Sequence, residues 1–209
     1  MSDQQLWKKI DQTSQGSPHY LNLSTDSCYY AREYVSRGGI RYPGNDRIEN
    51  FKKNNRYKNN PTVWKWKILA VQEFAKELAD FIPDNGVLAF MPTSKISSDS
   101  DFDERFELLK VELSLKRSDV VLIEPIILKA NVDASHLGGS RDPKSIKESY
   151  QFTGFSHPIP SHLFVIDDVI SSGGHFKAYK NLILDNYENI QVDGVFWALT
   201  VTHPLISMG

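Results

Sequence analysis

Short apolar runs alternate along this chain with segments of helical periodicity, and that alternation limits the fold more than any other feature. The runs that predict buried strands are 87–91, 120–123, 163–166 and 195–201. The segments whose apolar residues recur at spacings of three and four, and which therefore predict amphipathic helices, are 61–81, 102–113 and 175–186. Strands that alternate with helices form parallel sheets, so the sequence predicts an α/β fold around a parallel sheet.

The segment 61–81 carries the clearest helix signal. Asn60 is a residue type that caps helix N-termini, and Pro61 is favoured at the first helical position. The apolar stripe of this helix is predicted to be Trp64, Ile68, Val71, Ala75, Leu78 and Ile82.

Length and composition predict one globular domain with a small appendage. The chain has 209 residues, of which 40% are hydrophobic and 24% charged, which is enough apolar material for a buried core and excludes disordered and collagen-like chains. The start of the chain is polar and poor in apolar positions. We therefore predict an N-terminal arm at 1–40 and the α/β domain at 41–209.

The chain carries no sign of secretion or of a membrane segment. Cys28 is the single cysteine and cannot form an intrachain disulfide, which favours a reducing compartment. The first residues lack the apolar core of a signal peptide, and no apolar run approaches the roughly 18–20 residues that span a bilayer. The sequence predicts a cytoplasmic protein without membrane contacts.

One segment is locally basic although the whole chain has a net charge of only -2. Residues 47–67 hold seven lysines and arginines against one acid, Glu49. A solvated loop is the plain interpretation. The alternative is an edge that binds phosphates or nucleic acid.

The most informative stretch is 163–175, where four apolar residues precede Asp167 and Asp168, and a loop with two serines and two glycines leads into a helix. Ligands of open parallel sheets bind beyond the carboxyl ends of the strands. Glycines let a backbone approach an anion, and a helix N-terminus favours phosphate. Adjacent carboxylates suit hydroxyl donors or Mg²⁺ instead. The combination predicts a sugar-phosphate site, although the two acids could also serve only as favourable charges near a helix N-terminus.

This stretch resembles the phosphoribosyl pyrophosphate (PRPP) motif of type I phosphoribosyltransferases, so the expected fold is their Rossmann-like sheet. The resemblance implies that Asp167 and Asp168 bind the ribose hydroxyls, partly through Mg²⁺, and are the metal-binding and catalytic acids. It implies that Ser171, Ser172, Gly173 and Gly174 hold the 5-phosphate, with Val169 inside the motif. His175 stands where the family usually has Thr or Ser donating to that phosphate, and its imidazole can donate there too, so His175 is counted with the phosphate-binding residues.

The order of segments over roughly 40–205 looks like the ComF branch of that superfamily, without its zinc-binding cysteines. By this resemblance the pyrophosphate loop consists of Pro92, Thr93, Ser94 and Lys95, followed by Arg105. Lys95 is the expected leaving-group cation, and Arg141, in a loop at 130–149, would reach pyrophosphate when that loop closes. The plain alternatives are a surface arginine and an ordinary surface loop.

The resemblance implies binding of PRPP or a related ribose phosphate and transfer of its phosphoribosyl group, with release of pyrophosphate, in nucleotide metabolism. The acceptor is not specified by the sequence. One alternative is a non-catalytic module of the same fold that acts in a homo-oligomer or a larger assembly, as a ligand sensor, a defence or toxin effector or a competence component. A second alternative is a nucleic-acid-associated protein that uses residues 47–67.

Overall fold

The computed structural model describes residues 6–16, 18–35, 44–99, 102–131, 140–156 and 158–201. In these ranges the elements, in chain order, are β1 (Lys8–Lys9), β2 (Cys28–Val35), α1 (Asn45–Phe51), the 3₁₀ turn η1 (Asn55–Tyr57), α2 (Pro61–Phe81), β3 (Val87–Phe90), α3 (Arg105–Lys116), β4 (Val121–Ile123), β5 (Ile126–Leu128), α4 (Pro143–Ser149), β6 (Tyr150–Phe152), β7 (His162–Ile170), α5 (Gly174–Asn186) and β8 (Gln191–Val201). The predicted boundary between residues 40 and 41 lies outside the described residues.

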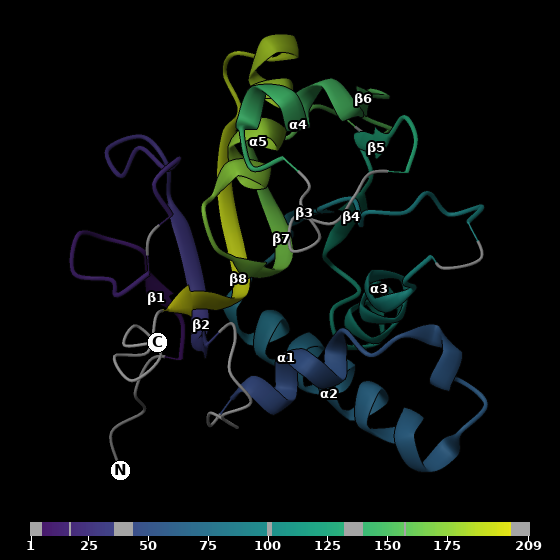
Figure 1. Ribbon diagram of the computed structural model, residues 1–209. Coiled ribbons are helices and arrows are strands. Elements are labelled where there is room, and N and C mark those ends of the chain that lie inside the picture. Colours follow the sequence, from purple (N-terminus) through teal and green to yellow (C-terminus); the bar gives the residue numbers. More distant parts are fainter. Residues whose placement is uncertain are drawn as a thin grey trace.

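The main sheet has six strands in the order β1-β2-β8-β7-β3-β4 (Figure 1). All neighbours are parallel except β1, which pairs antiparallel with β2. Strands β5 and β6 form a separate antiparallel pair. The predicted α/β fold around a parallel sheet is confirmed.

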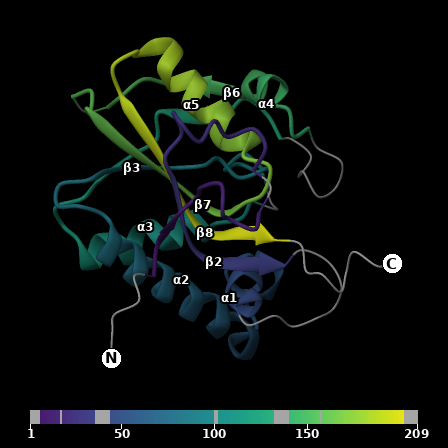
Figure 2. The same cartoon turned by 90° about the vertical axis from the view of Figure 1, so that its left-hand side faces the viewer.

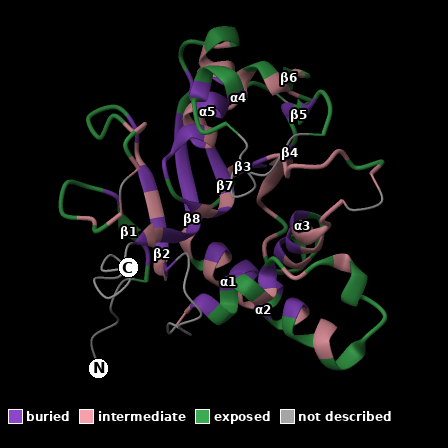
Figure 3. Ribbon diagram, in the orientation of Figure 1, coloured by how far each residue is buried: buried purple, intermediate pink, exposed green. Residues whose placement is uncertain are grey.

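Helices cover both faces of this sheet (Figures 1 and 2). One apolar cluster joins α1, α2 and α3 to one face, with Phe51, Phe74 and Leu109 among its fully buried members. The other cluster joins α4 and α5 to the opposite face, through residues such as Ile146 and Phe176. The central strands are buried between the two layers (Figure 3), which explains why they read as apolar runs in the sequence.

The direction in which strands are added to the sheet reverses at β3. Strand β4, next along the main sheet, lies on one side of β3, and β7 lies on the other. The backbone N–H of Met91 donates to the carbonyl of Ile166 over 2.9 Å, so the end of β3 lies directly beside the part of β7 that precedes Asp167. Such a reversal point is where open α/β sheets bind ligands.

The predicted helices and strands are all present, with shifted ends. Helix α2 begins where predicted, and the Asn60 side chain accepts the N–H of Val63. Strand β7 is longer than the predicted 163–166, because it stays paired with β8 as far as Ile170. Helix α1 and the β5–β6 pair were not predicted. No helix in the described ranges is long and apolar enough to cross a membrane.

Candidate functional site

The two acids of the motif lie within β7, not beyond its end. Because successive strand residues point to opposite faces, Asp167 and Asp168 are directed toward different helix layers. Asp168 is 4% exposed and contacts residues from the α1–α3 side. Asp167 is near Tyr150 on the other side, where burial and then the charge of Asp167 raise the pKa of the Tyr150 phenol. The acids therefore do not form one joint pair of ligands.

Asp168 belongs to a chain of alternating charges that joins four elements. Its carboxylate lies 2.9 Å from Arg105 Nη1 and 3.5 Å from Lys52 Nζ. Arg105 also lies 3.4 Å from Asp103, whose other oxygen is 2.8 Å from Lys67 Nζ. We call Lys52, Asp168, Arg105, Asp103 and Lys67 the ion-pair chain. Each of its carboxylates is shared by two cations.

The surroundings separate the pKa values of the two acids. Burial, reinforced by the neighbouring charge of Asp168, raises the pKa of Asp167 well above its usual range. Burial would also raise the pKa of Asp168, but Arg105 and Lys52 outweigh it and hold that pKa below its ordinary value. Asp168 is thus the charged member of the pair, while Asp167 is the one able to carry a proton near neutral pH.

The loop after β7 is packed against other parts of the chain. Gly173 has a φ of 81° and caps the N-terminus of α5. A Cβ atom at Gly173 would lie 3.0 Å from the Leu21 side chain, and Tyr20 N–H donates to the carbonyl of Ser172 over 3.0 Å. A Cβ atom at Gly174 would lie only 2.1 Å from the carbonyl oxygen of Arg141. The glycines therefore permit close approach by the chain itself, while the Ser171 side chain remains exposed.

His175 lies in the first turn of α5, and its Nδ1 shares a hydrogen bond of 3.0 Å with the Tyr150 hydroxyl. Burial lowers the pKa of His175, although the charge of Asp168 opposes it. The imidazole is thus held neutral in a structural contact between α5 and β6. Phosphate binding by His175 stays a prediction.

The loop after β3 lies beside a different feature, a cavity of about 350 Å³. Its walls include Thr93, Lys95, the rings of Phe102 and Phe106, and Asp103. Arg105, predicted to act with this loop, forms ion pairs with Asp168 and Asp103, and its role at pyrophosphate stays a prediction. Asp103 is the point where the cavity and the ion-pair chain meet.

The structure therefore groups the predicted residues in three places. Asp167, Asp168, Val169 and Arg105 lie around the end of β7. Arg141 lies over the loop Ser171–His175. Pro92, Thr93 and Lys95 line the cavity, and Ser94 lies in the same loop but not among the lining residues. Residues 132–139, the middle of the predicted catalytic loop, lie outside the described residues.

Sequence reasoning missed Lys52, Lys67 and Tyr150 as parts of this region. Lys67 had a usable signal, because it stands three and seven residues before the buried Ala70 and Phe74 on the inner face of α2. A buried lysine needs an acid as its ion-pair partner, which here is Asp103. Lys52 and Tyr150 had no comparable signal.

The basic segment is partly neutralised by acids from elsewhere in the chain. The pairs that do this are Arg47–Glu73, Lys52–Asp168, Lys58–Glu104 and Lys67–Asp103. Nucleic-acid binding by residues 47–67 stays a prediction.

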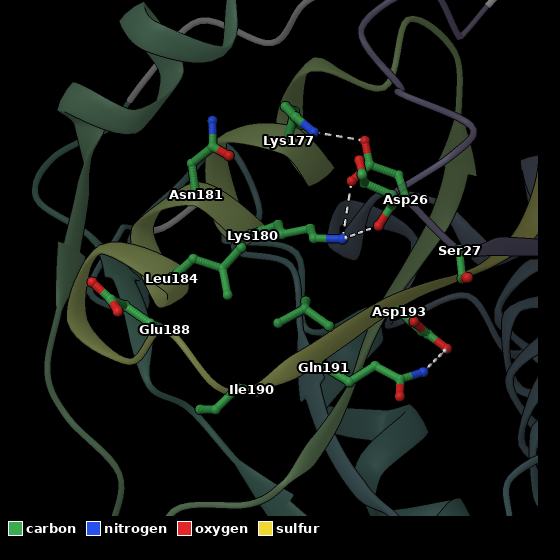
Figure 4. Close-up of a pocket in the computed structure, with 12 residues that line it drawn as sticks. Asp26, Ser27, Lys177, Lys180, Asn181, Leu184, Glu188, Ile190, Gln191 and Asp193 are labelled. Carbon is green, nitrogen blue, oxygen red and sulfur yellow. Dashed lines mark hydrogen bonds and ion pairs between the residues drawn. The ribbon is translucent and has the colours of Figure 1, made fainter.

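The N-terminal arm is anchored on α5 next to a second cavity of about 410 Å³ (Figure 4). The Asp26 carboxylate is completely buried and lies 2.7 Å from Lys177 Nζ and 2.9 Å from Lys180 Nζ. Lys180 also donates to the carbonyl of Thr25 over 2.8 Å. This anchor holds the arm in the position where Leu21 packs on Gly173.

The donor set fits a protein-held Mg²⁺ poorly. Mg²⁺ prefers carboxylate oxygens and keeps several waters. Asp168 and Asp103 are already shared by Arg105, Lys52 and Lys67, which leaves Asp167 as the one acid of this cluster outside an ion pair. The described residues contain no cluster of three or more acidic, histidine or cysteine ligands.

Comparisons with known proteins identify no family. No protein-family model and no curated protein matches the chain. Two solved crystal structures of hypoxanthine phosphoribosyltransferase from Staphylococcus aureus are distantly similar. The tetragonal form is 10% identical with a TM-score of 0.37, covering 63% of this chain and 73% of that one. The orthorhombic form is 11% identical with a TM-score of 0.33, covering 61% of each chain.

Proposed function

We propose that the chain binds PRPP or a related ribose phosphate and transfers its phosphoribosyl group to an acceptor, releasing pyrophosphate. One observation carries this proposal. The acidic motif of β7 and the glycine loop that opens α5 lie at the reversal point of the sheet, beside the loop that follows β3. Acceptors for sugar hydroxyls and an anion-binding helix N-terminus thus come together where such sheets bind ligands.

The roles follow from what each group can donate or accept. Asp167 accepts hydrogen bonds from a ribose hydroxyl, and Ser171 with the first turn of α5 receives the 5-phosphate. Arg105 and Lys52 lie on the other side of β7 and supply positive charge for the leaving pyrophosphate. The C1–oxygen bond to pyrophosphate breaks as the acceptor's lone pair forms the new bond to C1. Positioning and charge provide the catalysis, with no covalent intermediate on the protein.

Calorimetric titration with PRPP tests the binding step. At a pH above the raised pKa of Asp167, where this acid is charged, we expect Asp167→Asn to weaken binding by about tenfold or more, since a charge-assisted hydrogen bond is replaced by a neutral one. Asp46→Asn, an exposed acid of α1, is the matched control and should bind as the wild type does. Equal affinities for both variants would refute the site. Pyrophosphate release with a panel of nucleobases then tests transfer.

A second candidate is a non-catalytic module of the same fold. The specific observation in its favour is the close packing of Leu21 and Arg141 on the two glycines of the phosphate loop. This alternative expects tight, saturable PRPP binding with no pyrophosphate release for any base. Turnover with a base would exclude it.

A further inference from the structure

We infer that Lys52 and Arg105 take the place of a divalent cation at Asp168, so that the anionic ligand binds without a metal. This inference deepens the proposed function and rests on it for the identity of the ligand. It starts from the disagreement between the Mg²⁺ that the family resemblance implies and the cations that surround this acid.

Charge balance is the first support. The ion-pair chain holds two carboxylates, Asp168 and Asp103, and three cations. With Asp167 charged the whole cluster is neutral, and with Asp167 protonated it carries one positive charge. A divalent cation added here would have to approach two groups of its own sign that already contact Asp168. An anionic ligand, by contrast, meets a region that is neutral or positive.

The two cations are held in place by the core, which is the second support. Phe51 directly precedes Lys52, is fully buried, and its ring lies 5.4 Å from Phe74 and 5.9 Å from Phe106, centroid to centroid. Arg105 directly precedes Phe106, which is itself buried. Both charged side chains therefore start from rigid backbone positions, as a preorganised anion site requires.

The exposure of the two side chains gives them different roles. The Lys52 side chain is 36% exposed and reaches Asp168 from the solvent side at 3.5 Å. Arg105 is 16% exposed and closer, at 2.9 Å. Lys52 can therefore turn from Asp168 toward a ligand phosphate, while Arg105 stays and keeps the buried acid paired. Lys52 is the residue that contacts the ligand, and Arg105 is a positioning residue.

The test compares PRPP titrations of the full chain in excess EDTA and in excess Mg²⁺. The wild type should bind with similar affinity in both. Lys52→Gln should lose about tenfold or more in EDTA, and Mg²⁺ should restore part of that loss. Lys53→Gln is the matched control, because Lys53 has the same charge but donates to Asn50 and not to Asp168. A wild type that requires Mg²⁺, or equal losses in the two variants, would overturn the inference.

Absence of PRPP binding would refute the proposed function by itself. A second measurement then still tests whether Lys52 and Arg105 replace a divalent cation at Asp168. Mn²⁺ is titrated into the ligand-free proteins and followed by electron paramagnetic resonance. The wild type should show no saturable Mn²⁺ binding that depends on Asp168, so Asp168→Asn should leave the Mn²⁺ titration unchanged. Lys52→Gln should bind Mn²⁺ more tightly than Lys53→Gln does. Saturable, Asp168-dependent Mn²⁺ binding by the wild type contradicts the inference whatever PRPP does. Thermal unfolding confirms that each variant is folded.

Discussion

Substitution of Gly174 by alanine tests whether the glycine loop is needed by the fold itself. A Cβ atom there would lie 2.1 Å from the Arg141 carbonyl oxygen, well inside the 3.0 Å below which real Cβ contacts are essentially absent. The clashing atom is backbone, so no side-chain rotation relieves it, and either the start of α5 or residues 140–142 must move. Overpacking of this kind costs about 1–3 kcal/mol. We therefore expect Gly174→Ala to lower the free energy of unfolding of the ligand-free protein by about 2 kcal/mol.

Urea unfolding followed by the fluorescence of the buried Trp197 measures this loss, and hydrogen exchange locates it. Exchange should quicken at 140–149 in Gly174→Ala. Gly154→Ala is the control. The φ of 92° makes an alanine strained at Gly154, but a Cβ there meets nothing within 4 Å, so this variant has no steric clash. Its exchange at 140–149 should stay as in the wild type. If Gly174→Ala is as stable as the wild type, the glycine serves only ligand binding and the packing argument is refuted.

Three further predictions concern ionisable side chains that hold the fold together. Asp26→Asn should destabilise the protein by about 2–3 kcal/mol and speed proteolysis in the arm. Burial acts to raise the pKa of Asp26, but Lys177 and its other partners outweigh burial and hold that pKa low. The stabilisation that charged Asp26 gives the wild type is therefore present above about pH 4 and is lost as pH falls below it. Burial lowers the pKa of His175, so the stabilisation by the neutral imidazole is present above about pH 6.5 and is lost on acidification. His175→Gln should flatten the dependence of the unfolding free energy on pH below that value, and an unchanged dependence would refute this role of His175. Asp103→Asn should lower the free energy of unfolding by about 3 kcal/mol, because it leaves the buried charge of Lys67 without its ion-pair partner. Lys67→Met should lower it by less than half of that, as measured by urea unfolding. The reverse order of the two variants would contradict the ion-pair chain.

Periodicity predicted the parts of the fold that depend on apolar burial. Helix α2 begins at the predicted Asn60–Pro61 signal, and the four predicted strands of the main sheet all occur. The inner face of α2 was partly wrong, since Trp64 is not fully buried and Lys67 is. A stripe defined by apolarity cannot include a lysine whose burial depends on Asp103, a residue distant in sequence.

The candidate site was harder to predict, because its arrangement depends on contacts between distant segments. The motif located Asp167 and Asp168 but not their opposite directions, which follow from the continuation of β7 along β8. Lys52 reaches Asp168 only because α1 packs against α2 and α3, and α1 lies in a segment of Asn and Lys with little apolar periodicity. The contact of Leu21 with Gly173 joins two segments that are far apart in the sequence, and no local pattern encodes it.

The pairing of β2 with β8 has a consequence for the order of folding. Cys28 lies opposite Gly194, so nearly the whole chain must be made before this pair can form. Contacts of such sequence separation form late, because loop closure comes before any gain from pairing. During synthesis β2 can pair with β1 but lacks β8, and the segment before β2 has no completed sheet to pack on. The glycine loop of α5 is therefore expected to be open in the nascent chain and to become covered by Leu21 only as the last strand joins.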